Sequence, residues 1–217
     1  MPPILTVSDI KVRILIISDT HASPSLLSSL PTMPVDVVIH CGNLTQESKL
    51  SEFASALAFL KAINAPLKLA IPGNHDFTLD NAGLTWRRKY TKSTANKERR
   101  MRGDITPRWA MKHLDASMLR LIHPLSTTAR DKERRTGGFS IRRARGPVFN
   151  TGYTADVVIT DGPPLGVLDV TASDSKSHGG CPSLFAAVAM ARPRLQCFGH
   201  VCTGWGAKSI RWRDGPA

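Results

Sequence analysis

Chemically reactive side chains follow five short apolar stretches of this 217-residue chain, at the point where each stretch ends. The first of them, at 12–18, is rich in β-branched residues, which is typical of a buried strand. Ligands bind beyond the carboxyl ends of parallel strands, so side chains placed there are expected to lie close together. The candidate residues are Asp19, His21, Asn43, Asn74, His75, Asp76, Asp161, His200 and Cys202.

These residue types are the ones that bind metal ions in proteins. Carboxylate and amide oxygens suit hard cations, whereas imidazole and thiolate suit borderline metals such as zinc. A single polar residue at a strand end is usually a turn former, but five such ends are hard to explain as turn chemistry. Glycines beside the candidates let the backbone turn tightly and leave room for a substrate. The pattern therefore favours a metal site on one edge of a sheet.

The elements that must position these residues alternate along the chain. Predicted strands cover 12–18, 35–40, 67–72, 156–160, 194–199 and 207–212. Predicted helices cover 24–30, 47–63, 107–121 and 181–193. Strands alternating with helices predict an α/β fold with a parallel sheet, and no linker divides residues 1–217 into two domains.

The middle of the chain is strongly basic. The whole chain has a net charge of +12, and residues 86–145 hold 18 Lys and Arg against 5 Asp and Glu. Segment 86–150 is therefore either a solvated insertion or a surface for an anionic partner. We expect an exposed loop at 127–138 and an edge strand within 138–149.

The order of the motifs resembles the calcineurin-like metallophosphoesterase superfamily. The motifs are D-x-H at 19–21, G-N at 42–43, G-N-H-D at 73–76, D-G-P-P at 161–164 and G-H-V-C at 199–202. The stretches TDGPPLGVLD (160–169) and FGHVCTGWG (198–206) resemble its MPPED-type branch and fungal relatives of that branch. The resemblance covers residues 12–80 and 156–212, and it implies a four-layer α/β/β/α sandwich with two mixed sheets.

The resemblance also implies a chemistry. Family members use divalent ions, here one or two of Zn, Mn or Fe, to activate water against a small phosphoester of the phosphodiester or cyclic-nucleotide class. His75 would be the general acid, and Asp76 would orient it. By motif position the metal ligands would be Asp19, His21, Asn43, Asn74, Asp161, His200 and Cys202.

Three ligand positions depart from the family's pattern. Asn43 replaces the bridging aspartate, and Asp161 and Cys202 each replace a histidine. Asn43 matters most, because a neutral amide removes a negative charge from between two cations. We therefore expect weak or altered phosphoesterase activity.

Several hypotheses follow from these departures. The site is either re-tuned around a single metal ion or decayed, leaving a scaffold that binds an anionic partner. A re-tuned site would also suit metal-assisted chemistry on a small metabolite. A single ion would be held by one of two sets: Asp19, His21 and Cys202, or Asn74, Asp161 and His200.

Composition argues against other classes of protein. No apolar run approaches the roughly 20 residues that span a bilayer, and the first residues lack the features of a signal peptide. The four cysteines form no C-x-x-C pair, so reduced thiols are expected. We expect a soluble cytoplasmic protein without a membrane partner, and the sequence leaves its oligomeric state open.

Overall fold

The computed structural model describes two parts of the chain and three short strands between them. The first part is 11–79 without 31–32, and the second is 155–213 without 173. The short strands are β4 (Leu119–Leu121), β5 (Thr128–Ala129) and β6 (Ser140–Ile141). Most of the basic segment 86–150 thus lies outside the described residues, and its predicted binding role stays a prediction.

The first part forms a parallel sheet. Strands β1 (Ile14–Ile17), β2 (Val37–His40) and β3 (Leu67–Ala70) pair in that order, and β4 continues the sheet beyond β3. Register aligns Ile17 with His40 and His40 with Ala70, so all three strands end at the same level. The loops that follow them therefore meet at one edge, as predicted.

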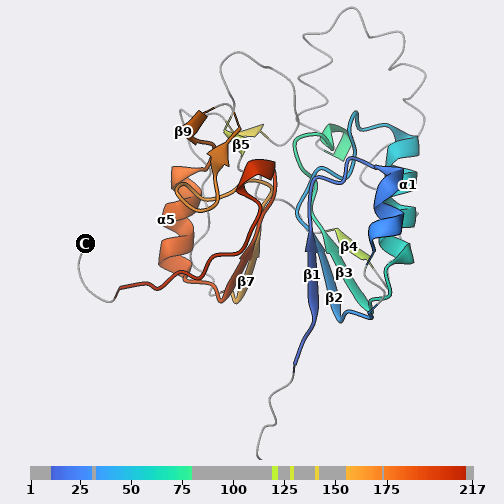
Figure 1. Cartoon of the computed structure of the whole chain (residues 1–217), viewed down its shortest axis with the longest axis horizontal. Coiled ribbons are helices and arrows are strands. Elements are labelled where there is room, and N and C mark those ends of the chain that lie inside the picture. The colour runs from blue at the N-terminus through green and yellow to red at the C-terminus, as the bar shows by residue number, and fades with distance from the viewer. Residues whose placement is uncertain are drawn as a thin grey trace, which may run out of the picture.

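Helix α1 (Leu50–Ala62) covers one face of this sheet (Figure 1). Its start is fixed by Glu52, whose carboxylate accepts the backbone N–H of Lys49 at 3.1 Å, and Pro66 follows its end. The apolar face of the helix and the sheet share a buried cluster: Val38, Leu44, Ala56, Phe59, Leu60, Ile63, Ala65 and Ala70. The predicted strand–helix order of this half is confirmed, and the predicted helix at 24–30 is the 3-10 helix η1 (Pro24–Ser29).

The second part forms a smaller unit. Strands β7 (Val157–Ile159) and β10 (Leu195–Cys197) pair in parallel, and helix α5 (Pro182–Ala191) lies beside them. Leu184 and Val188 bury the inner face of α5. A short antiparallel ribbon, β8 (Val170–Thr171) with β9 (Asp174–His178), was not predicted.

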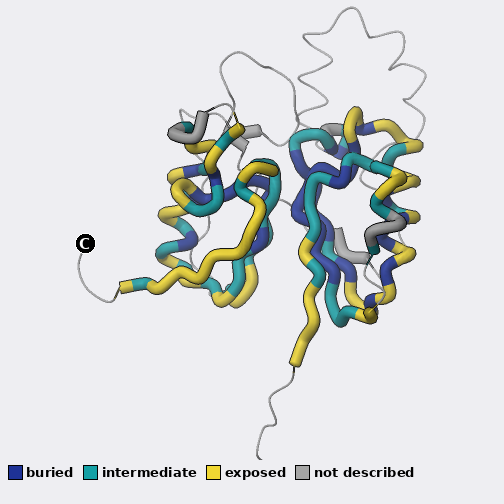
Figure 2. The backbone as a smooth tube through the Cα atoms, viewed as in Figure 1, coloured by how far each residue is buried: buried dark blue, intermediate teal, exposed yellow. Residues whose placement is uncertain are grey.

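A buried cluster joins residues of the two sheets. Ile39 of β2 and Cys41, which directly follows β2, share a buried cluster with Cys197 of β10. Partly buried residues from β2, β3, β7 and β10 surround this cluster. Figure 2 shows buried backbone on the strands of both parts and on the inner sides of α1 and α5. All four cysteines are free thiols, as predicted.

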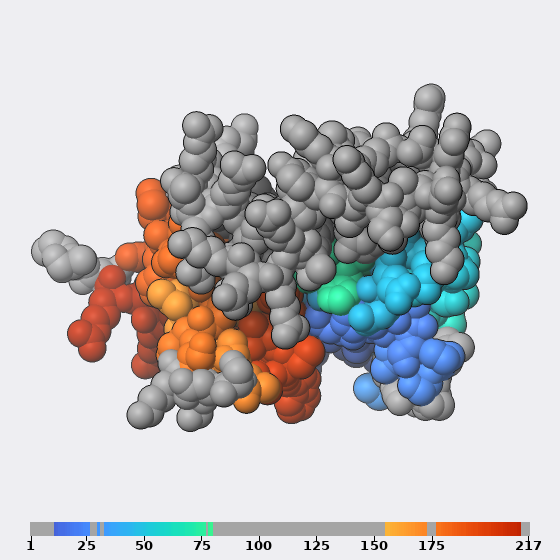
Figure 3. Space-filling view, turned by 90° about the horizontal axis from the view of Figure 1, so that it is seen from above, coloured from blue at the N-terminus to red at the C-terminus, as the bar shows by residue number. Residues whose placement is uncertain are grey.

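Viewed from above, described residues of the N-terminal and C-terminal parts lie next to each other (Figure 3). Gly199 N–H donates to the Asp161 carbonyl within the C-terminal part, and His200 N–H donates to the carboxylate of Asp19, which confirms the contact between the two parts. The first bond joins the loops after β7 and β10. The second joins the two sheets at their carboxyl ends.

Two predictions of secondary structure are wrong. Residues 207–212 form no strand: the segment is extended and mostly exposed, and Trp212 packs against Phe185 of α5 at 6.4 Å between ring centroids. Of the predicted helix 107–121, only 119–121 lie within the described residues, and they form strand β4 because pairing with β3 overrides the local helical pattern.

Other predictions for the middle are tested at a few residues only. Thr128 and Ala129, placed in a loop, form β5, which pairs with β6 inside the expected edge strand 138–149. The remaining residues of these stretches lie outside the described part of the chain. Within the described residues, no helix is long and apolar enough to cross a membrane.

Candidate metal centre

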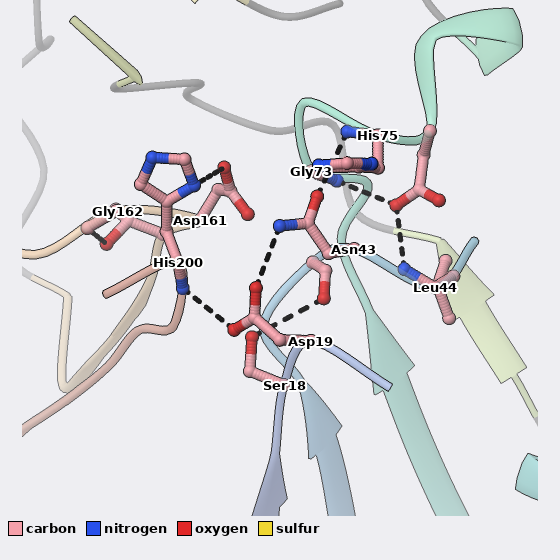
Figure 4. A network of polar contacts seen from close by, with 12 residues as sticks. Ser18, Asp19, Asn43, Leu44, Gly73, His75, Asp161, Gly162 and His200 are labelled. Atoms are coloured by element: carbon pink, nitrogen blue, oxygen red, sulfur yellow. Dashed lines mark hydrogen bonds and ion pairs between the residues drawn. The ribbon is translucent and has the colours of Figure 1, made fainter. Parts of the chain in front are cut away.

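The loops after β1, β2, β3, β7 and β10 bring the predicted ligands to one edge of the two sheets (Figure 4). The loop after β1 is tied to the loop after β2 by Asp19 N–H to the Gly42 carbonyl and His21 N–H to the Asn43 carbonyl, both at 3.0 Å. His200 N–H donates to Asp19 Oδ2 at 2.8 Å and adds the loop after β10. The sequence-based prediction that these motifs form one site is consistent with this geometry.

Backbone conformation is unusual at the same residues. Asp19, His21, Asn43 and His200 all have positive φ, between 48° and 70°. This left-handed region is uncommon for residues other than glycine and costs conformational energy. Four such residues at one edge indicate that surrounding contacts hold the loops in a strained arrangement that places their side chains.

The amide of Asn43 has a defined orientation. Its Nδ2 donates to Asp19 Oδ1 at 2.8 Å, and its Oδ1 accepts the backbone N–H of His75 at 3.0 Å. Turning the amide over would set Nδ2 against an N–H donor and Oδ1 against a carboxylate, so both bonds would be lost. Asn43, 2% exposed, is therefore a buried link between the Asp19 loop and the His75 loop.

The rings of His21 and His75 are held in the same way. His21 Nδ1 lies 3.0 Å from the Thr45 carbonyl, and His75 Nδ1 lies 2.7 Å from the Gln46 carbonyl. A carbonyl only accepts, so each Nδ1 carries the proton and each Nε2 keeps its lone pair or takes a second proton. The rings meet edge to face at 4.8 Å between centroids. In both histidines, Nε2 is therefore the ring nitrogen available to bind a ligand or to transfer a proton.

Asp161 is the least satisfied polar residue of the site. Its side chain is fully buried, and neither carboxylate oxygen has a hydrogen bond of normal geometry. Burial, the charge of Asp19 and the charge of Asp76 raise the pKa of Asp161 well above its usual value, and the backbone N–H of Asn74 offsets this only in part. A buried carboxylate without partners is costly unless a cation or proton neutralises it.

Two neighbours of Asp161 are also ready to accept a cation. The buried Oδ1 of Asn74 has no hydrogen-bond partner, and His200 Nδ1 lies 3.7 Å from Asp161 Oδ2. Burial lowers the pKa of His200, which favours the neutral ring that a metal requires. Oxygen atoms without hydrogen-bond partners next to an imidazole match the donors that a divalent first-row metal prefers. These residues therefore fit the predicted metal ion.

Gly73 keeps the centre of the site open. A Cβ atom at this position would collide with Asn43 Oδ1 and Asp161 Oδ1. The two oxygens, from the loops after β2 and β7, therefore border the same small space. No side chain other than hydrogen is compatible with that approach.

Cys202 occupies a different environment. It begins the short helix η3 (Cys202–Gly204) and is exposed. Partial burial and the charge of Asp19 raise the pKa of its thiol, which disfavours the thiolate needed for metal binding. Among the described residues, no group of three or more His, Cys, Asp and Glu side chains lies close enough to share an ion. A metal centre here must therefore draw on the asparagines.

Asp76, predicted to orient His75, makes its contacts elsewhere. Its buried carboxylate accepts hydrogen bonds from Gly73 N–H, Leu44 N–H, and both the N–H and hydroxyl of Thr45, at 2.6–3.0 Å. The His75 ring is oriented by Gln46 instead. Gln46 had no signal in the sequence, because it acts through its backbone carbonyl, and Thr45 contributes its backbone groups as well as its hydroxyl.

The Asp76→Ala variant is therefore expected to lose more than about 3 kcal/mol of unfolding free energy, because three backbone donors would be left buried without partners. Urea denaturation of the purified variant measures this loss. Unchanged stability together with lost activity would instead support the predicted catalytic role of Asp76.

His40 lies directly beneath the site. It is fully buried, its Nε2 lies 2.8 Å from Thr20 Oγ1, and its Nδ1 has no partner. Burial lowers the pKa of His40 to about 4, although the charge of Asp19 partly opposes this. The ring is therefore neutral in the folded protein at pH 7.

The unfolded chain binds a proton at His40 below pH 6.5, whereas the folded chain binds it only below about 4. Folding stability is expected to fall by up to about 3 kcal/mol as the pH drops through this window. The His40→Gln variant removes this contribution, so its stability should depend less on pH between 6.5 and 4. Denaturant titrations at four pH values test this, and parallel curves for both proteins would exclude His40 as the cause.

Comparison with known proteins gives a consistent result. A family model described as calcineurin-like phosphoesterase matches residues 12–203. Probable rhamnogalacturonate lyase C of Emericella nidulans is 27% identical, over 94% of this chain and 18% of that protein. Metallophosphoesterase domain-containing protein 1 of human is 26% identical, over 89% of this chain and 61% of that protein, and the mouse protein matches equally. The chain spans only part of the length of each relative.

Proposed function

Because the chain belongs to the calcineurin-like phosphoesterase family, we propose that it is a metal-dependent hydrolase acting on a small phosphoester. Enzymes of this family use divalent metals, and the similarity to metallophosphoesterase domain-containing protein 1 agrees with the MPPED-type branch. The proposed substrates are phosphodiesters, including cyclic nucleotides. The proposed setting is the cytoplasm.

The proposed fold is the four-layer sandwich of this family. The layers would be α5, the sheet containing β7 and β10, the sheet β1–β4, and α1. The buried cluster around Cys41 and Cys197 supports the packing of one sheet on the other. In the described residues, β1–β4 and the pair of β7 with β10 are parallel. The antiparallel strands that would make these sheets mixed are therefore part of the proposal.

The observation that carries the proposal is the buried, unpartnered carboxylate of Asp161 beside unpartnered Asn74 Oδ1. Asp161, Asn74 and His200 would hold a divalent ion. When bound, such an ion lowers the pKa of coordinated water and polarises a phosphoryl oxygen. The strained loops keep these side chains in place before the substrate arrives.

His75 would handle the proton of the leaving group. Its Nδ1–H is held by the Gln46 carbonyl, which leaves Nε2 free to carry a second proton. The ring then donates Nε2–H to the leaving oxygen and is reprotonated from water. His21, edge to face with His75, limits the positions that the ring can take.

Hydrolysis of bis-p-nitrophenyl phosphate, p-nitrophenyl phosphate and 2′,3′- and 3′,5′-cyclic nucleotides tests the proposal, with chelator treatment and metal add-back. We expect metal-dependent cleavage that falls about 100-fold or more in kcat for His75→Gln. His178→Gln, which alters an exposed histidine bonded to Asp169, serves as the matched control and should retain activity. A metal-loaded protein that cleaves none of these esters would reject the phosphoesterase and favour chemistry on another metabolite.

A further inference from the structure

The number and position of the metal ions in the site can be inferred from the polarity of the Asn43 amide, an inference that rests on the proposed function. An aspartate at this position offers lone pairs in two directions, whereas an amide offers them at Oδ1 only. The hydrogen bonds from His75 N–H and to Asp19 fix which direction keeps the lone pairs.

The nitrogen end of Asn43 faces Asp19. Nδ2 donates to Asp19 Oδ1, and His200 N–H donates to Asp19 Oδ2, so both carboxylate oxygens are already neutralised in part by N–H donors. A cation placed between Asp19 and Asn43 would meet the positive end of the amide dipole. Cys202, which would complete a site with Asp19 and His21, is exposed.

The oxygen of the Asn43 amide accepts the backbone N–H of His75 and borders the space at Gly73. Asn43 Oδ1 and Asp161 Oδ1 border the same space above Gly73. Asp161 and Asn74 contribute three buried oxygens without hydrogen-bond partners, and the His200 ring lies next to Asp161. The unsatisfied oxygen acceptors that the described residues bring to this edge therefore belong to Asp161 and Asn74, whereas both oxygens of Asp19 already accept hydrogen bonds, as Figure 4 shows.

We propose that the chain binds a single divalent first-row metal ion, held by Asn74, Asp161 and His200. The Asn43 amide donates a hydrogen bond to Asp19 and so occupies the position of an ion that Asp19, His21 and Cys202 would otherwise bind. Asp19, His21 and Cys202 are then not metal ligands: Asp19 anchors the backbone of His200, and His21 packs against His75. The mixed oxygen and nitrogen donors suit Mn²⁺, Fe²⁺ or Zn²⁺.

Calorimetric titration of the apoprotein with Mn²⁺ and Zn²⁺ and the absorption spectrum of the Co²⁺-loaded protein test this assignment. We expect one ion per chain and no thiolate-to-cobalt charge-transfer band. Asn74→Ala should weaken binding at least about ten-fold, the effect expected of a lost ligand. Cys202→Ser and His21→Gln should each bind one ion with wild-type affinity. Thermal unfolding of each apo variant checks that it is folded.

The other outcomes overturn the assignment in distinguishable ways. Two ions per chain, a thiolate band, or loss of binding in Cys202→Ser would reject the single site while leaving the phosphoesterase proposal in place. No binding in the folded wild-type protein would reject both proposals. One ion at the assigned site without cleavage of any phosphoester would reject the phosphoesterase alone.

Discussion

The Asn43→Asp variant is expected to bind a second metal ion and to cleave phosphodiesters faster than the wild-type protein. The substitution restores a carboxylate between Asp19 and Asp161, with lone pairs in both directions. It also removes the Nδ2–H bond to Asp19, so Asp19 becomes free to bind a cation. We expect affinity at this second position to rise at least about 10-fold to 100-fold, and the rate to rise with it.

The same variant should be less stable than the wild-type protein when metal is absent. The new carboxylate at position 43 would lie beside that of Asp19 without the hydrogen bond that now joins the two side chains, and like charges at this distance repel. Added Mn²⁺ should restore the melting temperature, because binding to the folded state alone stabilises it.

Metal titration and thermal unfolding of Asn43→Asp, with and without Mn²⁺, measure these effects. Asn64→Asp makes the same chemical change at an exposed residue after α1 and should change neither property. If Asn43→Asp still binds one ion and gains no activity, the amide is not what limits the site to a single metal.

The Asp161→Asn variant is expected to lose metal binding and yet to be more stable than the wild-type protein without metal. The wild-type carboxylate is buried and unpartnered, so replacing it with a neutral amide of the same shape removes an uncompensated charge. The gain should be about 1–3 kcal/mol at neutral pH. In a preorganised metal site, a metal-binding side chain such as Asp161 is expected to destabilise the metal-free protein.

The pH dependence of this gain has a definite sign. The folded protein holds a proton on Asp161 up to a higher pH than the unfolded chain does, so wild-type stability falls as pH rises above about 4. The Asp161→Asn variant has no carboxylate at this position, so its folding stability does not fall with pH for this reason. Its advantage should therefore shrink as the pH is lowered toward 4.

Urea denaturation of both chelated proteins from pH 4 to 7.5 measures the difference. Asp156→Asn, at an exposed residue just before β7, is the matched control and should show little change. A destabilised Asp161→Asn protein would mean that the carboxylate has partners that support the fold, and the case for a cation there would fail.

The strands and the positions of the candidate residues were predictable from the sequence. Runs of apolar residues set the parallel strands β1, β2 and β3, and equal register at their ends brings the polar loops together. The motif order then predicted which side chains meet. The strand predictions succeeded because they depend on local pattern and on the shared edge of a parallel sheet. The roles of the side chains at that edge stay predictions.

The direction in which each side chain acts was not predictable. Spacing along the chain placed Asn43 and Asp76 correctly, but the donors around them belong to backbone N–H groups of distant loops. The same limit explains the error at 119–121, where pairing with β3 forms a strand. It also explains the error at 207–212, which has no strand partner among the described residues. Long-range pairing is a tertiary property that local periodicity does not report.

The most direct test of the account is an anomalous difference map from crystals grown with Mn²⁺, collected above the manganese absorption edge. We predict one peak per chain, in contact with the side chains of Asn74, Asp161 and His200. A peak bounded by Asp19, His21 and Cys202, or two peaks on either side of Asn43, would contradict the account.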